Sequence, residues 1–225
     1  MTDDKYILFF NWAALLIVPL FFEEKTMIYD ALGRFSKRHS FYNINNKLTT
    51  QNSDIIGVIN GCLDLYPSPF NSQDARLILL MGEHHKYFWE LVKKELFRVS
   101  ESDKKEQIEQ KITSFEVGYG TILFFIDPVI TSKLSQNYPQ FAPKFPEWAE
   151  QNNAMLQFMI WTAFAEKNIG ASLQHYSPLI DNIIKKEFQI NPDWKFVAQM
   201  PFGGISDSPK PHDVKYINER LIVRP

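Results

Sequence analysis

The order of apolar and polar residues divides the chain into helical and extended segments. Apolar residues three and four positions apart share one helical face, which predicts helices at 26–38, 53–65, 83–99 and 177–188. Ser53 and Ser177 are the expected helix caps. Segments 100–115 and 127–136 predict a capped, mostly solvated helix and a short helix. Runs rich in β-branched and aromatic residues predict strands at 75–81, 118–127, 193–203 and 219–225.

These elements do not follow the strict strand–helix alternation of a doubly wound fold. We therefore expect an α+β protein with a mainly antiparallel central sheet and helices packed around it. The length of 225 residues fits one domain, or at most two small ones, with a sizeable core.

The segment 154–165 is apolar at nearly every position. A helix that is hydrophobic on every side must be buried on every side. This is difficult inside a two-layer domain, so we expect the helix at the interface of a homodimer. The alternative is a central core helix in a monomer.

The N-terminal segment 1–26 contains an almost wholly apolar run of 17 residues, 6–22, after the acidic start MTDDK. Three interpretations remain: a helix packed on the domain or on a partner subunit, an upstream start with the working protein beginning near Met27, or a membrane anchor. The short run, its Asn11 and Pro19, and the absence of a basic flank argue against the anchor and against a signal peptide. We expect the functional domain at 27–225.

Charge and cysteine content restrict the partners and the compartment. The net charge is −2, which argues against nucleic acid as the main partner because binding phosphates requires an excess of Lys and Arg. The single cysteine, Cys62, cannot form an internal disulfide, and its helical surroundings predict a buried thiol. We expect a cytoplasmic protein.

Common catalytic and metal-binding motifs are missing. The sequence has no Walker loop, no GxGxxG after a strand, no HExxH and no GxSxG. The adjacent His84 and His85 would point about 100° apart on a helix, so they are poor ligands for one metal. We therefore predict no metal site and no hydrolase chemistry.

Two loops carry groups suited to a ligand. Arg38 and Ser40, two positions apart in an extended segment, can present a forked donor and a hydroxyl to a phosphate. The alternative is a basic helix C-terminus. Asn71 and Gln73 in PSPFNSQ can present donors and acceptors to a heterocycle. The alternative is an ordinary turn, and spacing alone does not choose the ligand role in either loop.

Taken together, the segments resemble a known family. KRHSFYNI, PSPFNSQDARLILLMGEHHKYFW, GYGTILFFID, GASLQHYSPLID and DWKFVAQMPFGGI follow one another with the order and spacing of FMN-dependent nitroreductases. The resemblance extends from about Met27 to the C-terminus. It is strongest to the subgroup of the yeast fatty-acid repression mutant proteins and small bacterial nitroreductases. It implies the nitroreductase α+β sandwich and an intertwined homodimer with FMN at the interface.

The resemblance also implies cofactor contacts. Arg38 and Ser40 would hold the FMN phosphate, with His39 where a second arginine is common. Asn71 and Gln73 would reach the flavin from the partner subunit. Four further residues would approach the pyrimidine side of the ring, mainly through backbone N–H groups: Ser172, Leu173, Gln174 and His175. Lys210 or His212 would complete the phosphate site, and His85 matches a helix start whose role the resemblance leaves open.

The implied activity is an FMN-dependent NAD(P)H oxidoreductase. NADH or NADPH would reduce the flavin, and a nitroaromatic or quinone would then replace the nucleotide, without a dedicated acid or base side chain. The alternative is a non-catalytic flavin-binding regulator in lipid or stress signalling, because a fold does not by itself establish an activity.

Overall fold

The computed structural model describes residues 30–209 and 220–224. Its centre is a five-stranded sheet of β1 (Ile44–Asn45), β2 (Ala75–Met81), β3 (Gly120–Ile126), β4 (Ile169–Ala171) and β5 (Lys195–Ile205). The order is β1-β5-β3-β2, with β4 also paired to β5, and every ladder is antiparallel. The expected α+β fold with an antiparallel sheet is therefore confirmed.

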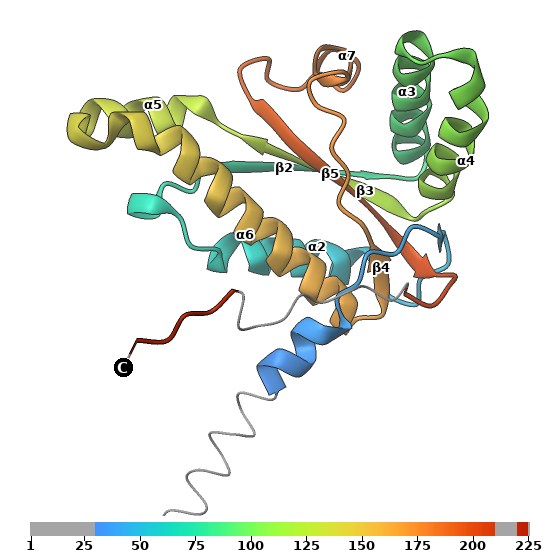
Figure 1. Ribbon diagram of the computed structural model, residues 1–225, viewed down its shortest axis with the longest axis horizontal. Coiled ribbons are helices and arrows are strands. Elements are labelled where there is room, and N and C mark those ends of the chain that lie inside the picture. The colour runs from blue at the N-terminus through green and yellow to red at the C-terminus, as the bar shows by residue number, and fades with distance from the viewer. Residues whose placement is uncertain (1–29, 210–219, 225) are drawn as a thin grey trace, which may run out of the picture.

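Helices cover both faces of this sheet (Figure 1). One face packs against α2 (Asn52–Leu65) and α6 (Phe145–Glu166). The other packs against α3 (Glu83–Val99), α4 (Lys105–Glu116) and α7 (Asp181–Glu187). The remaining helical elements are residues 30–37, α5 (Pro128–Asn137) and the short 3₁₀ helices Pro69–Asn71, Ser102–Lys104 and Pro139–Lys144.

Strand β3 lies between the two hydrophobic cores and is buried along its whole length. Its side chains alternate between the faces, as in any strand. Ile122 and Phe124 join the core under α2 and α6. Leu123 and Phe125 join the core under α3, α4 and α7. This explains why the segment reads as a continuous apolar run rather than an alternating one.

Three predicted details were wrong. Helix α2 begins at Asn52 after Gln51, without a side-chain cap, so Ser53 is not the cap. Helix α7 begins at Asp181, because residues 177–180 form a turn and the Ser177 hydroxyl donates to the Asp181 carboxylate instead of capping. Residues 220–224 form no strand with the rest of the described chain, and a strand needs a neighbour for its backbone groups.

The apolar helix predicted at 154–165 is the C-terminal part of α6. One side of α6 is fully buried, including Leu156, Ile160 and Phe164. The opposite side is not: Met155 is 49% exposed and Phe158 is 41% exposed. Among the described residues of one chain the helix is thus covered on one side only, which contradicts the alternative of a central core helix in a monomer, and burial at a dimer interface stays a prediction. We call the exposed pair Met155 and Phe158 the α6 stripe.

Some predictions lie outside the described residues. These are the N-terminal extension 1–26, Lys210 and His212. Among the helices that the structure describes, none has the length and apolar character of a membrane span.

Candidate functional site

Residues 38–43, which we call the edge strip, run along the outer edge of β4. Ser40 forms a parallel bridge with Ala171, and the Phe41 N–H donates to the Ala171 carbonyl at 3.0 Å. The Trp161 indole N–H of α6 donates to the carbonyls of His39 and Ala171, both at 3.2 Å. The C-terminal end of α6 therefore joins the edge strip to the sheet.

The predicted phosphate residue Arg38 is half-buried in this strip. Its guanidinium carbon lies 4.5 Å from the centre of the Trp161 ring. Stacking uses the face of the guanidinium and leaves the N–H groups at its edge available as donors. The ring thus holds Arg38 beside Ser40 in a form suited to an anion, and its phosphate role stays a prediction.

Residues 172–176 continue from β4 alongside β5. The N–H groups of Ser172 and Gln174 donate to the carbonyls of Pro201 and Gln199, at 3.3 and 2.8 Å. Consecutive N–H groups of an extended chain point in opposite directions, so those of Leu173 and His175 point away from β5. Only these two of the four predicted residues offer a backbone donor to a ligand. The Gln174 side chain is buried and donates to the Ser172 hydroxyl at 3.2 Å.

Helix α4 approaches both of these segments. Its Phe115 ring lies 6.4 Å from the ring of Tyr42 in the edge strip, and the Lys111 ammonium lies 5.8 Å from the ring of Tyr176. We call the edge strip, residues 172–176 and these two α4 residues the edge half-site; Figure 1 shows the three segments around the end of β5. Sequence reasoning missed Lys111 because 100–115 reads as solvated, although Lys111 is four positions before the buried Phe115.

His85 fixes the position of α4. Its Nε2 lies 3.1 Å from the Glu116 carbonyl, the last residue of α4, and its Nδ1 lies 2.8 Å from the Thr121 hydroxyl of β3. Trp89 donates its indole N–H to the same hydroxyl at 2.9 Å. Burial lowers the pKa of His85 from 6.5 to about 4. His85 is therefore a neutral structural residue, with Nε2–H as donor and Nδ1 as acceptor, and it is not available to a ligand.

The second predicted site is the loop 67–73, between α2 and β2. Phe70, Asn71 and Gln73 have φ values of 53°, 52° and 49°, a left-handed conformation that side chains other than glycine adopt at some cost. The Gln73 amide donates to the Asn71 carbonyl oxygen at 3.1 Å, and both side chains are exposed. The structure thus brings the two predicted side-chain amides together and leaves the side-chain N–H groups of Asn71 and the side-chain oxygen of Gln73 for a ligand.

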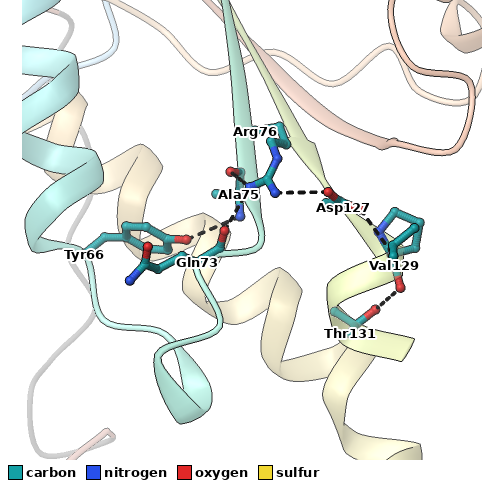
Figure 2. Close-up of polar contacts among 8 residues, drawn as sticks. Tyr66, Gln73, Ala75, Arg76, Asp127, Val129 and Thr131 are labelled. Carbon is teal, nitrogen blue, oxygen red and sulfur yellow. Dashed lines mark hydrogen bonds and ion pairs between the residues drawn. The ribbon is translucent and has the colours of Figure 1, made fainter. Parts of the chain in front are cut away.

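Hydrogen bonds at the C-terminal end of the loop hold it in place (Figure 2). The Ala75 N–H donates to the Tyr66 hydroxyl at 3.3 Å, and Arg76 donates to the Gln73 carbonyl at 2.9 Å. Arg76 also pairs with Asp127 at 3.0 Å, and Asp127 accepts from the Val129 N–H at the start of α5. These contacts therefore link the loop to β2 and to the start of α5.

A cavity of about 410 Å³ adjoins the loop. Its lining is mainly apolar and consists of Pro67, Ser68, Pro69, Phe70, Trp148, Gln151, Asn152 and Met155. Phe70 is 51% exposed and stacks on Tyr138 with 4.4 Å between ring centres. We call the loop and this cavity the loop half-site.

The two half-sites lie at opposite ends of the sheet. The loop half-site precedes Ala75, which pairs with Ile126 at one end of β3. The edge half-site adjoins Phe202, which pairs with Gly120 at the other end. Seven residues of strand separate these ends by about 20 Å. A single chain therefore does not bring Arg38 and Ser40 together with Asn71 and Gln73.

Comparisons with known proteins agree with the fold and its motifs. The sequence model described as "Nitroreductase family" matches residues 37–204. The nitroreductase FRM2 of Saccharomyces cerevisiae is 27% identical over 174 residues, which cover 76% of this chain and 86% of FRM2.

Solved structures show the same architecture. The nitroreductase CinD of Lactococcus lactis, in complex with nicotinic acid, has a TM-score of 0.80 and 31% identity, over 86% of this chain and 99% of CinD. Its complexes with chloramphenicol and with 4-nitrophenol each have a TM-score of 0.77 and 32% identity over the same shares. A nitroreductase with bound FMN from Desulfitobacterium hafniense shares the fold, with a TM-score of 0.64 and 16% identity over 86% of this chain and 97% of that protein. The chain therefore belongs to the nitroreductase family, in the subgroup that includes yeast FRM2.

Proposed function

We propose that the protein is a homodimeric oxidoreductase that uses FMN to reduce a nitroaromatic or a quinone at the expense of NADH or NADPH. Family membership supports oxidoreductase chemistry, and the relatives crystallised with FMN, 4-nitrophenol and chloramphenicol support the cofactor and the acceptor class. When bound, FMN would supply the hydride chemistry, accepting from the nucleotide and donating to the acceptor in ping-pong order.

The described donor set fits FMN. Arg38 and Ser40 present a cation with free N–H edges and a hydroxyl, which suit a phosphate. Leu173 and His175 present backbone N–H groups from the next segment, which suit the acceptor atoms of the pyrimidine edge. In this arrangement the protein binds and orients the cofactor, and no side chain acts as a proton donor. His85 is excluded from that role because both of its nitrogens are engaged in the core.

The observation that carries the proposal is the placement of the half-sites along α6. The loop half-site contacts its N-terminal end, where Phe70 lies 5.7 Å from Phe145. The edge strip contacts its C-terminal end through Trp161. The helix has 22 residues and is therefore about 33 Å long. The exposed α6 stripe lies between the two ends.

A twofold axis near the α6 stripe would both cover the exposed apolar side of α6 and bring the two separated half-sites together. It would cover Met155 and Phe158 with their copies from the partner, which removes exposed apolar surface. It would also place the N-terminal end of one α6 beside the C-terminal end of its copy. The loop half-site of one chain would then lie beside the edge half-site of the other. Each FMN would then be bound by both chains. The apolar cavity with Phe70 and Trp148 suits an aromatic acceptor at such a site.

The first experiment is a direct test of the activity. We expect the purified full chain to elute as a dimer, to bind FMN, and to oxidise NADH or NADPH only when a nitroaromatic or quinone is added. Protein that binds no FMN in an equilibrium titration would refute the proposal. Protein that binds FMN without turnover of any nucleotide would instead favour the non-catalytic regulator.

The second experiment tests the shared site with two defective chains. Arg38→Ala impairs the edge half-site and Gln73→Ala impairs the loop half-site. If the half-sites come from different chains, a mixed dimer has one site with both changes and one intact site. Mixing the variants after dissociation should then restore up to a quarter of wild-type activity. Half of the dimers are mixed, and each mixed dimer has one intact site out of two. Co-refolding each variant with itself is the control, and no recovery in the mixture would place both residues at one chain's own site.

A further inference from the structure

The lysines in and next to α3 and α4 differ in whether a carboxylate neutralises their charge. Lys93 lies 3.9 Å from Glu109 and from Glu116, and Lys104 lies 3.2 Å from Glu101. The Lys111 ammonium instead lies over the Tyr176 ring at 5.8 Å. No carboxylate of the described residues is within 4 Å of it. Its positive charge is therefore not neutralised by a neighbouring side chain in the part of the chain that the structure describes.

The neighbouring Tyr176 ring carries no negative charge that would neutralise Lys111. Burial raises the pKa of Tyr176 to about 12, so the ring stays neutral and contributes only its aromatic face. Tyr176 directly follows His175, one of the two residues whose N–H points away from β5. The cation is thus held at the end of the segment that the proposed function places at the pyrimidine edge of FMN.

The position of Lys111 is also defined by the core. Phe115, one helical turn further along, is fully buried and packs on Trp89 at 5.0 Å. The end of α4 is joined to His85 by the hydrogen bond to the Glu116 carbonyl. The backbone at Lys111 is therefore fixed by the core, and its exposed side chain reaches the Tyr176 ring from there.

We propose that Lys111 is the cation that stabilises the negative charge of reduced FMN, so that it favours the reduced over the oxidised cofactor. The inference rests on the proposed function, since it requires an FMN site at the edge half-site. A positive charge strengthens binding of the anionic reduced form more than that of the oxidised ring, because the two forms differ by that charge. Lys111 would therefore raise the midpoint potential of the bound FMN.

The test compares Lys111→Met with Lys105→Met. Lys105 lies on the same helix, also 5.8 Å from a ring, that of Phe97, and also without a carboxylate of the described residues within 4 Å. The dissociation constant of oxidised FMN is measured by fluorescence titration of the apoprotein, and the midpoint potential of the holoprotein by reduction against a reference dye. Together they give the ratio of affinities for the two forms.

We expect Lys111→Met to weaken binding of reduced FMN about tenfold more than binding of oxidised FMN, which lowers the midpoint potential by about 30 mV for two electrons. Lys111→Arg should retain the wild-type ratio, and Lys105→Met should leave it unchanged. An unchanged ratio in Lys111→Met, or an equal change in Lys105→Met, would overturn the role of Lys111 while leaving the proposed function intact. A wild-type protein that binds no FMN would overturn both.

Discussion

The two half-sites differ in how far apart their contacts lie along the chain. The backbone of the loop 67–73 is held by near neighbours, although its cavity also uses side chains of α6: the Gln73 N–H donates to the Ser68 hydroxyl five positions away, and Arg76 donates to the Gln73 backbone carbonyl three positions away. The edge half-site is assembled from distant segments: Trp161 and His39 are 122 positions apart. The loop can therefore be recognised from a short stretch of sequence, whereas the edge half-site exists only once the sheet and helices have formed.

This difference predicts where substitutions will act. A change in the core beside β3 should disturb the edge half-site, because α4 is placed by buried hydrogen bonds. A change inside the loop should have a smaller and local effect. The following predictions test this contrast in order of expected size.

Thr121→Val should have the largest effect. It keeps the shape of the side chain but removes the hydroxyl that serves both His85 and Trp89. Each of the two buried groups left without a partner costs about 1–3 kcal/mol, so we expect a loss of about 2–6 kcal/mol in unfolding free energy. Urea denaturation measures it. Thr113→Val, at an exposed position of α4, is the control and should change stability by less than about 0.5 kcal/mol.

The pH dependence of stability should also depend on His85. Its pKa is lowered by burial from 6.5 to about 4, so the unfolded chain binds this proton more readily than the folded one. The contribution of neutral His85 to the unfolding free energy is fully present above pH 6.5. As the pH falls toward 4, up to about 3 kcal/mol of it is lost. Urea denaturation at several pH values should show a steeper loss in the wild type than in His85→Gln. Equal slopes would contradict a neutral buried His85.

Arg38→Ala should weaken FMN binding about 10- to 100-fold, because a hydrogen-bonded charge is worth about 1.5–3 kcal/mol. The dimer and its unfolding transition should remain, since Arg38 is only half-buried. Lys37→Ala is the matched control: this neighbour pairs with Glu166 and is largely exposed. Equal FMN affinity in the two variants would contradict the phosphate role of Arg38.

Ser68→Ala should have the smallest effect. It removes the hydroxyl that accepts the Gln73 N–H at 3.1 Å, a bond worth about 1 kcal/mol at a partly exposed site. We expect a loss of about 1 kcal/mol in unfolding free energy and an FMN affinity within about fivefold of wild type. Ser132→Ala, at an exposed position of α5, is the control. A loss as large as that of Thr121→Val would remove the contrast between the half-sites.

Much of the fold could be predicted because its signals are local. The period of apolar residues located α2 and α3, a continuous apolar run located the C-terminal part of α6, and runs of β-branched and aromatic residues located β2, β3 and β5. The turn residues of PSPFNSQ predicted an irregular loop, which the structure confirms, whereas the hydrogen bond between Gln73 and Asn71 was not predicted. Some failures lie at element ends: the predicted start of α7 relied on a Ser177 cap, but that hydroxyl bonds Asp181 instead. Another is the strand predicted at 219–225, which residues 220–224 do not form.

The sequence by itself determined most of the longer helices and strands and the loop 67–73, because periodicity and turn chemistry act within about ten residues. Tertiary structure alone decided that one side of α6 stays exposed, that His85 is a buried neutral residue, and that Lys111 lies beside Tyr176. It also decided that Arg38 and Gln73 face opposite ends of one sheet. The reason is physical: strand order and helix packing bring distant residues together, and no pattern along a single segment encodes which ones will meet.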